Sequence, residues 1–354
     1  MIRDILSSFA TANYSMTRKI ITRLHKNESG IIEVVGESGS GKTYVFQNLH
    51  KELLSEKINF KMFVPNLFKY NQLFGVLRLV SDISRDQFEE ILVEASTKGI
   101  ERKYDLFFFL SEYLFDKDLI KPVSVLIYEG YLLDRYTVDF IQYLVEYCVS
   151  VSVKFVIFNR KSAFAFADIH NILKPEAEDL RKIIQSIKSD SENQYIKESE
   201  LIKEISDGNL FVVEYLLEKF TKRNEELDFS SYLDKNINVV TIHAERLAEL
   251  SNEQIELLMV IFLIAEEANL EVIAKVWKHK TIKKTINELI ASHFIFEVNE
   301  CYYVNKIFAV QTALSSLKED KKESLFKLII DNLDERKIRD FKIKINRSDR
   351  EIMQ

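Results

Sequence analysis

Eight consecutive residues carry the clearest chemical signal in the sequence: Gly36-Glu37-Ser38-Gly39-Ser40-Gly41-Lys42-Thr43 fits the pattern G-x-x-x-x-G-K-[ST]. Such a loop closes backbone N–H groups around anionic phosphates, which needs turns free of side chains. In this pattern the lysine reaches the terminal phosphates and the threonine hydroxyl is a ligand of Mg²⁺. Only eight glycines occur in 354 residues, so three within one motif do not reflect a glycine-rich background. The motif, with the adjoining Tyr44, predicts a site for ATP or ADP and Mg²⁺.

The segments on either side of this loop have the order that phosphate binding requires. Residues 30–35 are typical of a buried strand, and residues 43–55 carry apolar side chains at helical spacing. The helix would begin at the loop, so its unpaired N–H groups and the positive end of its dipole would face the phosphates. The sequence therefore predicts a strand, a phosphate-binding loop and a helix in direct succession.

The apolar run from Pro122 to Glu129 ends in an acid and predicts a buried parallel strand. In the Walker B motif, an Asp at the end of such a strand holds the Mg²⁺ shell, and a following acid polarises the attacking water. Tyr128 stands in the place of that Asp, so Glu129 becomes the catalytic candidate and, with Thr43, the candidate metal ligand. Two alternatives stay open. Either hydrolysis is weak and the protein mainly binds nucleotide, or Glu129 is a surface acid; Asp134 is a weaker substitute.

Another apolar run, residues 151–158, is followed by Asn159 and Arg160. Because the carboxyl ends of parallel strands share one edge of a sheet, these two residues are expected beside the phosphate loop. There one of them would sense the γ-phosphate or orient water, with Arg160 the catalytic candidate and Asn159 the nucleotide-binding candidate. The alternative is that Asn159 and Arg160 only end the strand and have no role at a nucleotide site.

Periodicity divides the chain into four parts. Residues 1–173 predict an α/β nucleotide-binding domain with a parallel sheet, and residues 174–235 a helical lid interrupted at Gly208-Asn209. Residues 236–310 predict a winged-helix domain, and residues 311–354 a helical tail. Further strands are expected near 59–64 and 167–173, and helices near 67–79, 85–95, 105–115, 136–149, 308–317 and 324–333.

The winged-helix interpretation depends on three helices followed by a hairpin. A helix capped by Ser251 precedes helices at 270–277 and 282–292, and residues 294–304 are able to pair as two strands. Three lysines near the third helix would reach DNA phosphates if that helix entered a groove. Acidic residues flank these lysines and no arginine accompanies them, so an intramolecular packing module is favoured over DNA reading. The residues concerned are Lys280, Lys283, Lys284, Glu288 and Glu297.

Composition points to a soluble globular protein: 47% of residues are hydrophobic and 29% are charged. The formal charge of −6 argues against wholesale electrostatic binding of nucleic acid. The sequence contains no run of about 18 apolar residues, the length that would predict a membrane span. Cys148 and Cys301 lie far apart among apolar residues and are interpreted as buried thiols, which fits a cytoplasmic location.

Taken in order, the phosphate loop, the two strands with polar ends, the lid and the winged helix resemble the STAND class of signal-transducing P-loop ATPases, relatives of the AAA+ family. The resemblance spans about residues 15–335. It implies that, with diphosphate bound, the winged helix folds onto the nucleotide domain. Exchange for ATP would release it, so that subunits assemble with one another or with protein partners.

The resemblance also implies nucleotide contacts outside the first domain. In that class a G-N-P motif in the lid contacts the nucleotide, and Gly208-Asn209-Leu210 is similar to it, with Leu210 in place of the proline. A His after the hairpin contacts the diphosphate, and Asn305 stands at that place here. Asn209, Leu210 and Asn305 are therefore expected to contact the nucleotide. The departures at Tyr128, Leu210 and Asn305 are expected to weaken catalysis or nucleotide sensing.

Three functions follow from these observations. The first is a cytoplasmic ATP-binding regulatory switch, a slow ATPase if active. The second is an ATP-dependent DNA-binding protein of the origin-recognition or transcription-regulator type, against which the net charge and Glu288 speak. The third is a pseudo-ATPase scaffold that nucleotide stabilises without turnover, motivated by Tyr128.

Overall fold

The computed structural model describes residues 11–26, 28–65, 72–147, 152–188, 195–222, 237–264, 268–298, 300–305 and 319–332. The chain divides into two compact units, Met1–Phe229 and Ser230–Gln354. The helix expected at 308–317, residues 67–71 of the helix expected at 67–79, and Cys148 lie outside the described residues.

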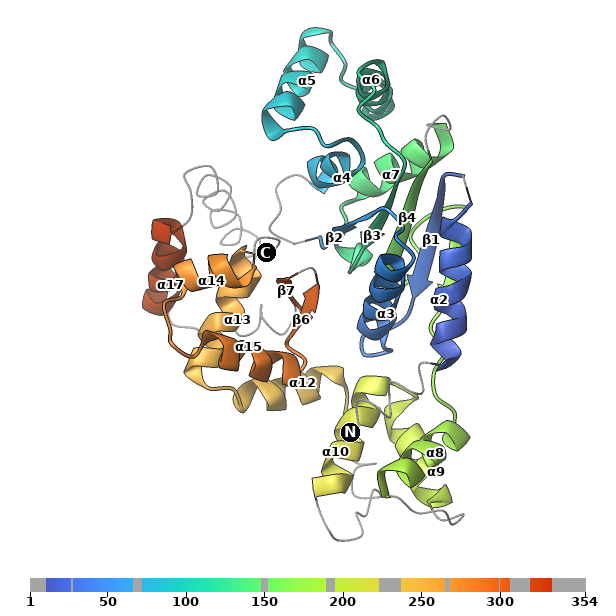
Figure 1. Cartoon of the computed structure of the whole chain (residues 1–354), viewed down its shortest axis with the longest axis vertical. Helices are drawn as coiled ribbons and strands as arrows, with labels where there is room; N and C mark the ends of the chain where they lie inside the picture. Colours follow the sequence, from blue (N-terminus) through green and yellow to red (C-terminus); the bar gives the residue numbers. More distant parts are fainter. Residues whose placement is uncertain are drawn as a thin grey trace. The chain divides into compact units, whose positions relative to one another are not determined.

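A five-stranded parallel sheet forms the centre of the described part of the first unit, which confirms the α/β prediction (Figure 1). Its strands run in the order β2-β3-β4-β1-β5. Their bounds are Gly30–Val35 for β1, Phe60–Phe63 for β2, Val123–Ile127 for β3, Val153–Asn159 for β4 and Asp168–Asn171 for β5. Val35 lies beside both Asn159 and Asn171, so the residues that follow β1, β4 and β5 emerge at one edge.

Helices cover both faces of this sheet because successive strand residues point to opposite sides. On one face, Val125, Ile127 and Ile157 belong to an apolar core built with α4, α5, α6 and α7. On the other face, Phe46 of α3 packs against Tyr128 and Phe158. The bounds are Thr11–Leu24 for α2, Lys42–Ser55 for α3, Gln72–Ser81 for α4, Arg85–Thr97 for α5, Lys103–Asp116 for α6, Gly130–Leu132 for the 3-10 helix η1 and Arg135–Tyr147 for α7.

Three helices follow β5 in the same unit, at the position of the expected lid. They are α8 (Ala177–Lys188), α9 (Ile196–Ser206) and α10 (Leu210–Lys222). The turn between α9 and α10 has left-handed backbone at Asp207 and Gly208, with φ of 45° and 68°. The interruption expected at Gly208-Asn209 is therefore confirmed, and it is a tight turn.

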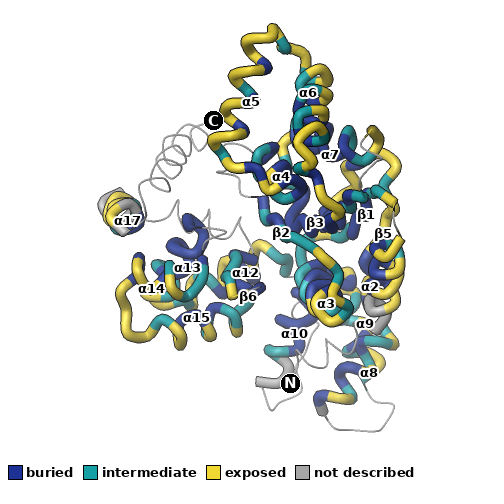
Figure 2. The backbone as a smooth tube through the Cα atoms, turned by 45° about the horizontal axis from the view of Figure 1, so that its top comes forward, coloured by how far each residue is buried: buried dark blue, intermediate teal, exposed yellow. Residues whose placement is uncertain are grey.

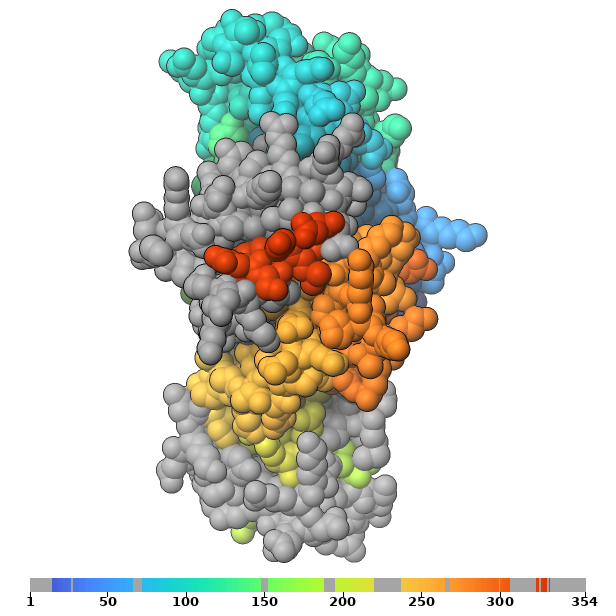
Figure 3. Space-filling model, turned by 90° about the vertical axis from the view of Figure 1, so that its left-hand side faces the viewer, coloured from blue at the N-terminus to red at the C-terminus, as the bar shows by residue number. Residues whose placement is uncertain are grey.

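The second unit contains the expected three helices and hairpin in the expected order. These are α13 (Asn252–Ile264), α14 (Leu270–Val276), α15 (Ile282–Ala291) and the antiparallel pair β6 (Ile295–Val298) and β7 (Cys301–Val304). Ser251 caps α13 as predicted, since its hydroxyl accepts from the Gln254 N–H. The unit also contains α12 (Val239–Ala248), which was not predicted, and α17 (Glu319–Asn332). In Figure 3 the red atoms of α17 lie against orange atoms of the same unit.

Among the described residues, burial largely follows the apolar pattern of the sequence. The strand β3 is dark blue in Figure 2, and every residue of it is buried. Cys301, in contrast, is only half-buried on β7, which has one neighbouring strand, β6. In the part of the chain that the structure describes, no helix has the length and apolar character needed to span a membrane.

Candidate functional site

The loop between β1 and α3 is wound tightly enough that glycine is required at three positions. Gly39 and Gly41 have φ of 84° and 100°, in the left-handed region that favours glycine. A Cβ on Gly36 would lie 2.4 Å from the Ser40 hydroxyl oxygen. The Gly36 N–H donates to the Asn159 carbonyl at 3.0 Å, which fixes the loop to the end of β4.

Two side chains inside this loop fit a phosphate ligand. The Lys42 ammonium is buried and donates to the carbonyls of Gly36 and Glu37, at 2.5 and 2.8 Å. The buried hydroxyl of Ser40 has no hydrogen-bond partner among the described residues. An anion in the loop would pair with the ammonium and accept from this hydroxyl, so the residues present fit the phosphates of a nucleotide.

The Thr43 hydroxyl, expected to bind Mg²⁺, lies 2.5 Å from the hydroxyl of Tyr128. Tyr128 directly follows β3 and is 1% exposed, with its ring 5.0 Å from that of Phe46. Burial, followed by the nearby Glu129 charge, raises the pKa of Tyr128 well above its ordinary value, so the phenol stays neutral. The position expected for a metal-binding Asp is thus occupied by an uncharged group that is bonded to Thr43.

Glu129 and Arg160 are brought to the same sheet edge, with Tyr131 between them. Glu129 is buried, in left-handed backbone with φ of 58° at the start of η1. The Arg160 guanidinium stacks 3.8 Å from the centre of the Tyr131 ring and donates to its hydroxyl at 2.7 Å. Burial, followed by the Glu129 charge, raises the pKa of Tyr131. Tyr131 was not among the predicted site residues. Asp134 caps α7 by accepting from the Thr137 N–H at 2.7 Å.

Asn159 is fully buried and its amide donates to the Glu33 carboxylate at 2.8 Å. Glu33 lies within β1 and is also fully buried. It accepts from the Ser162 hydroxyl at 2.6 Å and from the Ala163 N–H at 3.0 Å. Glu33 therefore ties the segment that contains Arg160 to β1. Sequence reasoning missed this role, although one acid inside an otherwise apolar strand signals a buried charge that needs partners.

The predicted lid motif contacts the phosphate loop directly. The Asn209 amide donates to the Ser38 carbonyl at 2.7 Å, and the Phe211 N–H donates to the Gly39 carbonyl at 3.1 Å. A Cβ on Gly41 would lie 2.9 Å from a methyl group of Leu210. Asn209 also caps α10, because its carbonyl oxygen accepts from the Phe211 N–H. We name the two bonds to Ser38 and Gly39 the lid latch.

Asn209→Asp is expected to speed amide hydrogen exchange in the peptide 36–44 about fivefold. Aspartate keeps the cap acceptor but loses the donor to Ser38, and one hydrogen bond is worth about 1 kcal/mol. Hydrogen-exchange mass spectrometry measures the effect. Asn269→Asp, at the cap of α14, is the matched control and should leave this peptide unchanged. Equal exchange in the parent and Asn209→Asp would contradict the lid latch.

Asn305 and the lysines of the third helix belong to the second unit. The Asn305 amide donates to the His293 carbonyl at 3.2 Å, and its N–H donates to the Phe294 carbonyl at 2.8 Å, so it closes the hairpin. Lys280, Lys283 and Lys284 are exposed, and the Lys284 ammonium lies 3.7 Å from the Glu288 carboxylate. The expected contact of Asn305 with a nucleotide stays a prediction.

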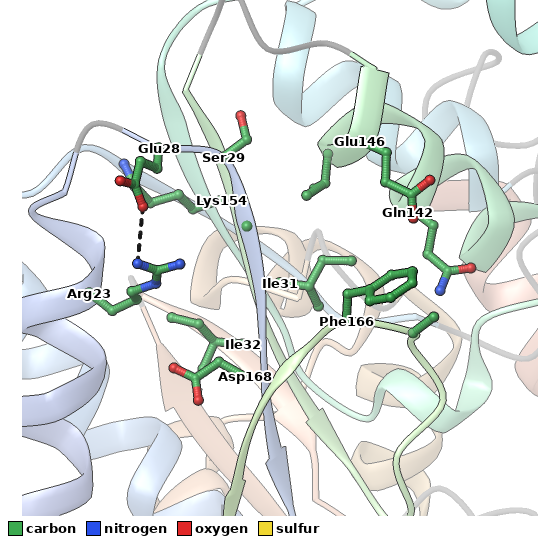
Figure 4. A pocket seen from close by; sticks show the side chains of 13 residues that line it. Arg23, Glu28, Ser29, Ile31, Ile32, Gln142, Glu146, Lys154, Phe166 and Asp168 are labelled. Atoms are coloured by element: carbon green, nitrogen blue, oxygen red, sulfur yellow. Dashed lines mark hydrogen bonds and ion pairs between the residues drawn. The ribbon is translucent and has the colours of Figure 1, made fainter.

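A pocket of about 160 Å³ lies at the opposite edge of the sheet, where β1 and β4 begin (Figure 4). Arg23, paired with Glu28 at 3.1 Å, and Lys154 line it together with Phe166. Burial lowers the pKa of Lys154. Because the phosphate loop follows the carboxyl end of β1, this pocket is not part of the candidate nucleotide site.

Comparisons with known proteins give similarity of structure only. No family model matches the sequence, and no curated protein matches it. The chain is similar to a Signal Transduction ATPase with Numerous Domains (STAND) protein with a tetratricopeptide repeat sensor from Pyrococcus horikoshii, with a TM-score of 0.50 and 15% identity. The match covers 86% of this chain and 43% of that one, so the chain spans less than half the length of this neighbour.

Two further solved structures have lower scores. Drosophila ORC bound to DNA gives a TM-score of 0.39 at 14% identity, covering 85% of each chain. The Aeropyrum pernix ORC2 protein in ADPNP-ADP complexes gives 0.34 at 13% identity, covering 86% of this chain and 93% of that one.

Proposed function

Since the chain has the P-loop NTPase fold of the AAA+ group, we propose that it is a nucleotide-dependent regulatory switch of the STAND type. In this proposal the loop Gly36–Thr43 holds ATP or ADP, residues 174–235 act as the lid, and residues 236–310 act as a winged-helix domain. Asn305 contacts the diphosphate when that domain is closed, and the switch acts in the cytoplasm.

The lid latch is the observation that supports the proposal best. The phosphate-binding loop and the lid share two hydrogen bonds, so a ligand that moves the loop carbonyls of Ser38 and Gly39 also changes the contact with α10. Two such bonds contribute roughly 1–3 kcal/mol together. A coupling of this size changes an equilibrium about 5- to 150-fold, which is typical of allosteric effects.

Switching requires that ATP and ADP bind the two arrangements with different affinities, since equal affinities would shift nothing. Rapid hydrolysis is not needed, because exchange alone changes the bound nucleotide. Slow turnover, with Glu129 polarising water and Arg160 contacting the γ-phosphate, is the catalytic part of the proposal. DNA reading is not part of it, because Lys284 on the third helix is paired with Glu288.

The molecular mass of the full chain is expected to depend on the nucleotide supplied. Chain stripped of nucleotide should run as a smaller species with ADP and as a larger one with ATP or a non-hydrolysable ATP analogue. Size-exclusion chromatography with light scattering measures both. Lys42→Ala should give one mass under all three conditions. Identical masses for the parent with the three nucleotides would contradict nucleotide-dependent assembly.

A further inference from the structure

The geometry points to a nucleotide site that takes its ligand without Mg²⁺, with the hydroxyl of Tyr128 as the partner of Thr43 in place of a metal ion. This inference rests on the proposed function, because it concerns the same loop. It assigns Tyr128 as the residue that sets the metal requirement of the site.

The distance between the two hydroxyl oxygens does not fit two ligands of one Mg²⁺ ion. Mg²⁺ holds its ligands at about 2.0–2.1 Å in near-ideal octahedral geometry, so neighbouring ligand oxygens lie about 2.9 Å apart. The oxygens of Thr43 and Tyr128 are 2.5 Å apart, which is the length of a short hydrogen bond between hydroxyl groups. The two groups are therefore bonded to one another and are not arranged as two ligands of one ion.

Packing holds the phenol in this place. Tyr128 is 1% exposed, and its ring lies 5.0 Å from that of Phe46 and 6.4 Å from that of Phe158. Swinging the ring away from Thr43 would displace neighbours in a close-packed layer between β3, β4 and α3. A phenol is neutral at physiological pH, and it is a poor ligand for a hard cation that prefers carboxylates.

The other acids near this sheet edge have different partners. Glu33 accepts from Asn159, Ser162 and Ala163. Asp134 caps α7. Glu129 begins η1 in left-handed backbone, and its charge acts on Tyr128 and Tyr131. Among the described residues, no three His, Cys, Asp or Glu side chains are grouped closely enough to hold a metal ion.

Phosphate charge would then be balanced by Lys42, by the N-terminus of α3 and by the loop N–H groups. One ammonium and one helix end balance the charge of a diphosphate more completely than that of a triphosphate, whose γ-phosphate would depend on Arg160, and the Arg160 guanidinium lies against Tyr131. A site of this kind favours ADP in the absence of metal, which suits a switch that rests in its diphosphate state.

The test is titration calorimetry of the full chain, stripped of nucleotide, with ADP and ATP in EDTA and in excess Mg²⁺. The expected ratio of Kd in EDTA to Kd in Mg²⁺ is within about twofold of one for ADP. A ratio of about ten or more, with tighter binding in Mg²⁺, would overturn the inference and leave the proposed function intact. Absence of binding in both conditions would overturn the proposed function and the inference with it.

Two variants test whether Tyr128 sets the metal requirement. The ratio of Kd in EDTA to Kd in Mg²⁺ is compared within each variant, so a general loss of stability does not change it. Tyr128→Asp restores a carboxylate and is expected to raise the ratio about tenfold. Tyr128→Phe keeps the packing against Phe46, releases the Thr43 hydroxyl and is expected to raise the ratio by a smaller factor. If Tyr128→Asp does not fold, Tyr128→Phe alone tests the inference. A ratio that stays near one in a folded variant would show that Tyr128 does not set the metal requirement.

Discussion

Nucleotide affinity is expected to fall about 10- to 100-fold in Lys42→Ala. A hydrogen bond that involves a charged group is worth about 1.5–3 kcal/mol, and each 1.4 kcal/mol changes a dissociation constant tenfold. Lys42 is buried in the loop, where its ammonium already lies beside the carbonyls of Gly36 and Glu37. Titration calorimetry with ADP measures the loss. ADP should also raise the Tm of the parent and leave that of Lys42→Ala nearly unchanged, because only a bound ligand stabilises the folded state.

Lys51→Ala is the matched control, since Lys51 lies on the same helix α3 with its side chain exposed. It removes the same charge from the protein and should leave the affinity for ADP unchanged. Equal affinity in Lys42→Ala and Lys51→Ala would mean that the loop is not the nucleotide site. Circular dichroism of both variants separates loss of binding from loss of fold.

Glu33→Leu is expected to lower the free energy of unfolding by about 1–3 kcal/mol. Leucine has a similar volume but leaves the Asn159 amide, the Ser162 hydroxyl and the Ala163 N–H without their acceptor inside the protein. Only the Asn159 amide is a fully buried donor, and a buried donor without a partner costs about 1–3 kcal/mol, whereas the exposed Ser162 and Ala163 are able to donate to water. Urea unfolding followed by circular dichroism measures the change, provided that the slope with urea is the same in both proteins.

Two further variants show whether the carboxylate itself matters. Glu33→Gln keeps one acceptor oxygen and is expected to lose about half as much free energy as Glu33→Leu. Glu90→Gln, on the exposed side of α5, should stay within about 0.5 kcal/mol of the parent. A loss below about 1 kcal/mol in Glu33→Leu would mean that the three bonds to Glu33 contribute little net stability.

The segment held by Glu33 also carries the candidate catalytic Arg160. Glu33 bonds the residues directly after β4, and Arg160 lies against Tyr131 at the same edge. Changes at Glu33 therefore act on the position of Arg160 through the backbone. Asn159 and Arg160 are neighbours in sequence but have different roles. The Asn159 amide is buried and donates to Glu33, whereas Arg160 is exposed and its guanidinium lies over the Tyr131 ring.

Local signals account for most of what was predicted correctly. The phosphate loop is contiguous, and Gly39 and Gly41 are favoured by the left-handed backbone angles of the loop itself. The apolar runs at 30–35, 122–127 and 153–158 became parallel strands because long apolar stretches in this setting are buried on both faces. The cap at Ser251 is formed by a residue three positions away, and the turn at Gly208 has the left-handed backbone that favours glycine. The prediction that Cys301 is a buried thiol was wrong, since its side chain is only half-buried. Burial depends on how many layers of the fold cover a strand, and the residues next to Cys301 in sequence do not specify that number.

Contacts between distant segments were decided by the tertiary structure. The sequence by itself determined that a phosphate loop precedes α3 and that Tyr128 replaces the expected acid. It did not determine what Tyr128 contacts. That partner, Thr43, lies 85 residues away, Glu33 and Asn159 are separated by 126 residues, and Asn209 and Ser38 by 171. Each pair meets because the strand order β2-β3-β4-β1-β5 brings those strand ends and the lid to one edge of the sheet. Strand order depends on the packing of the whole unit, so local sequence patterns fixed the elements while only long-range packing fixed their partners.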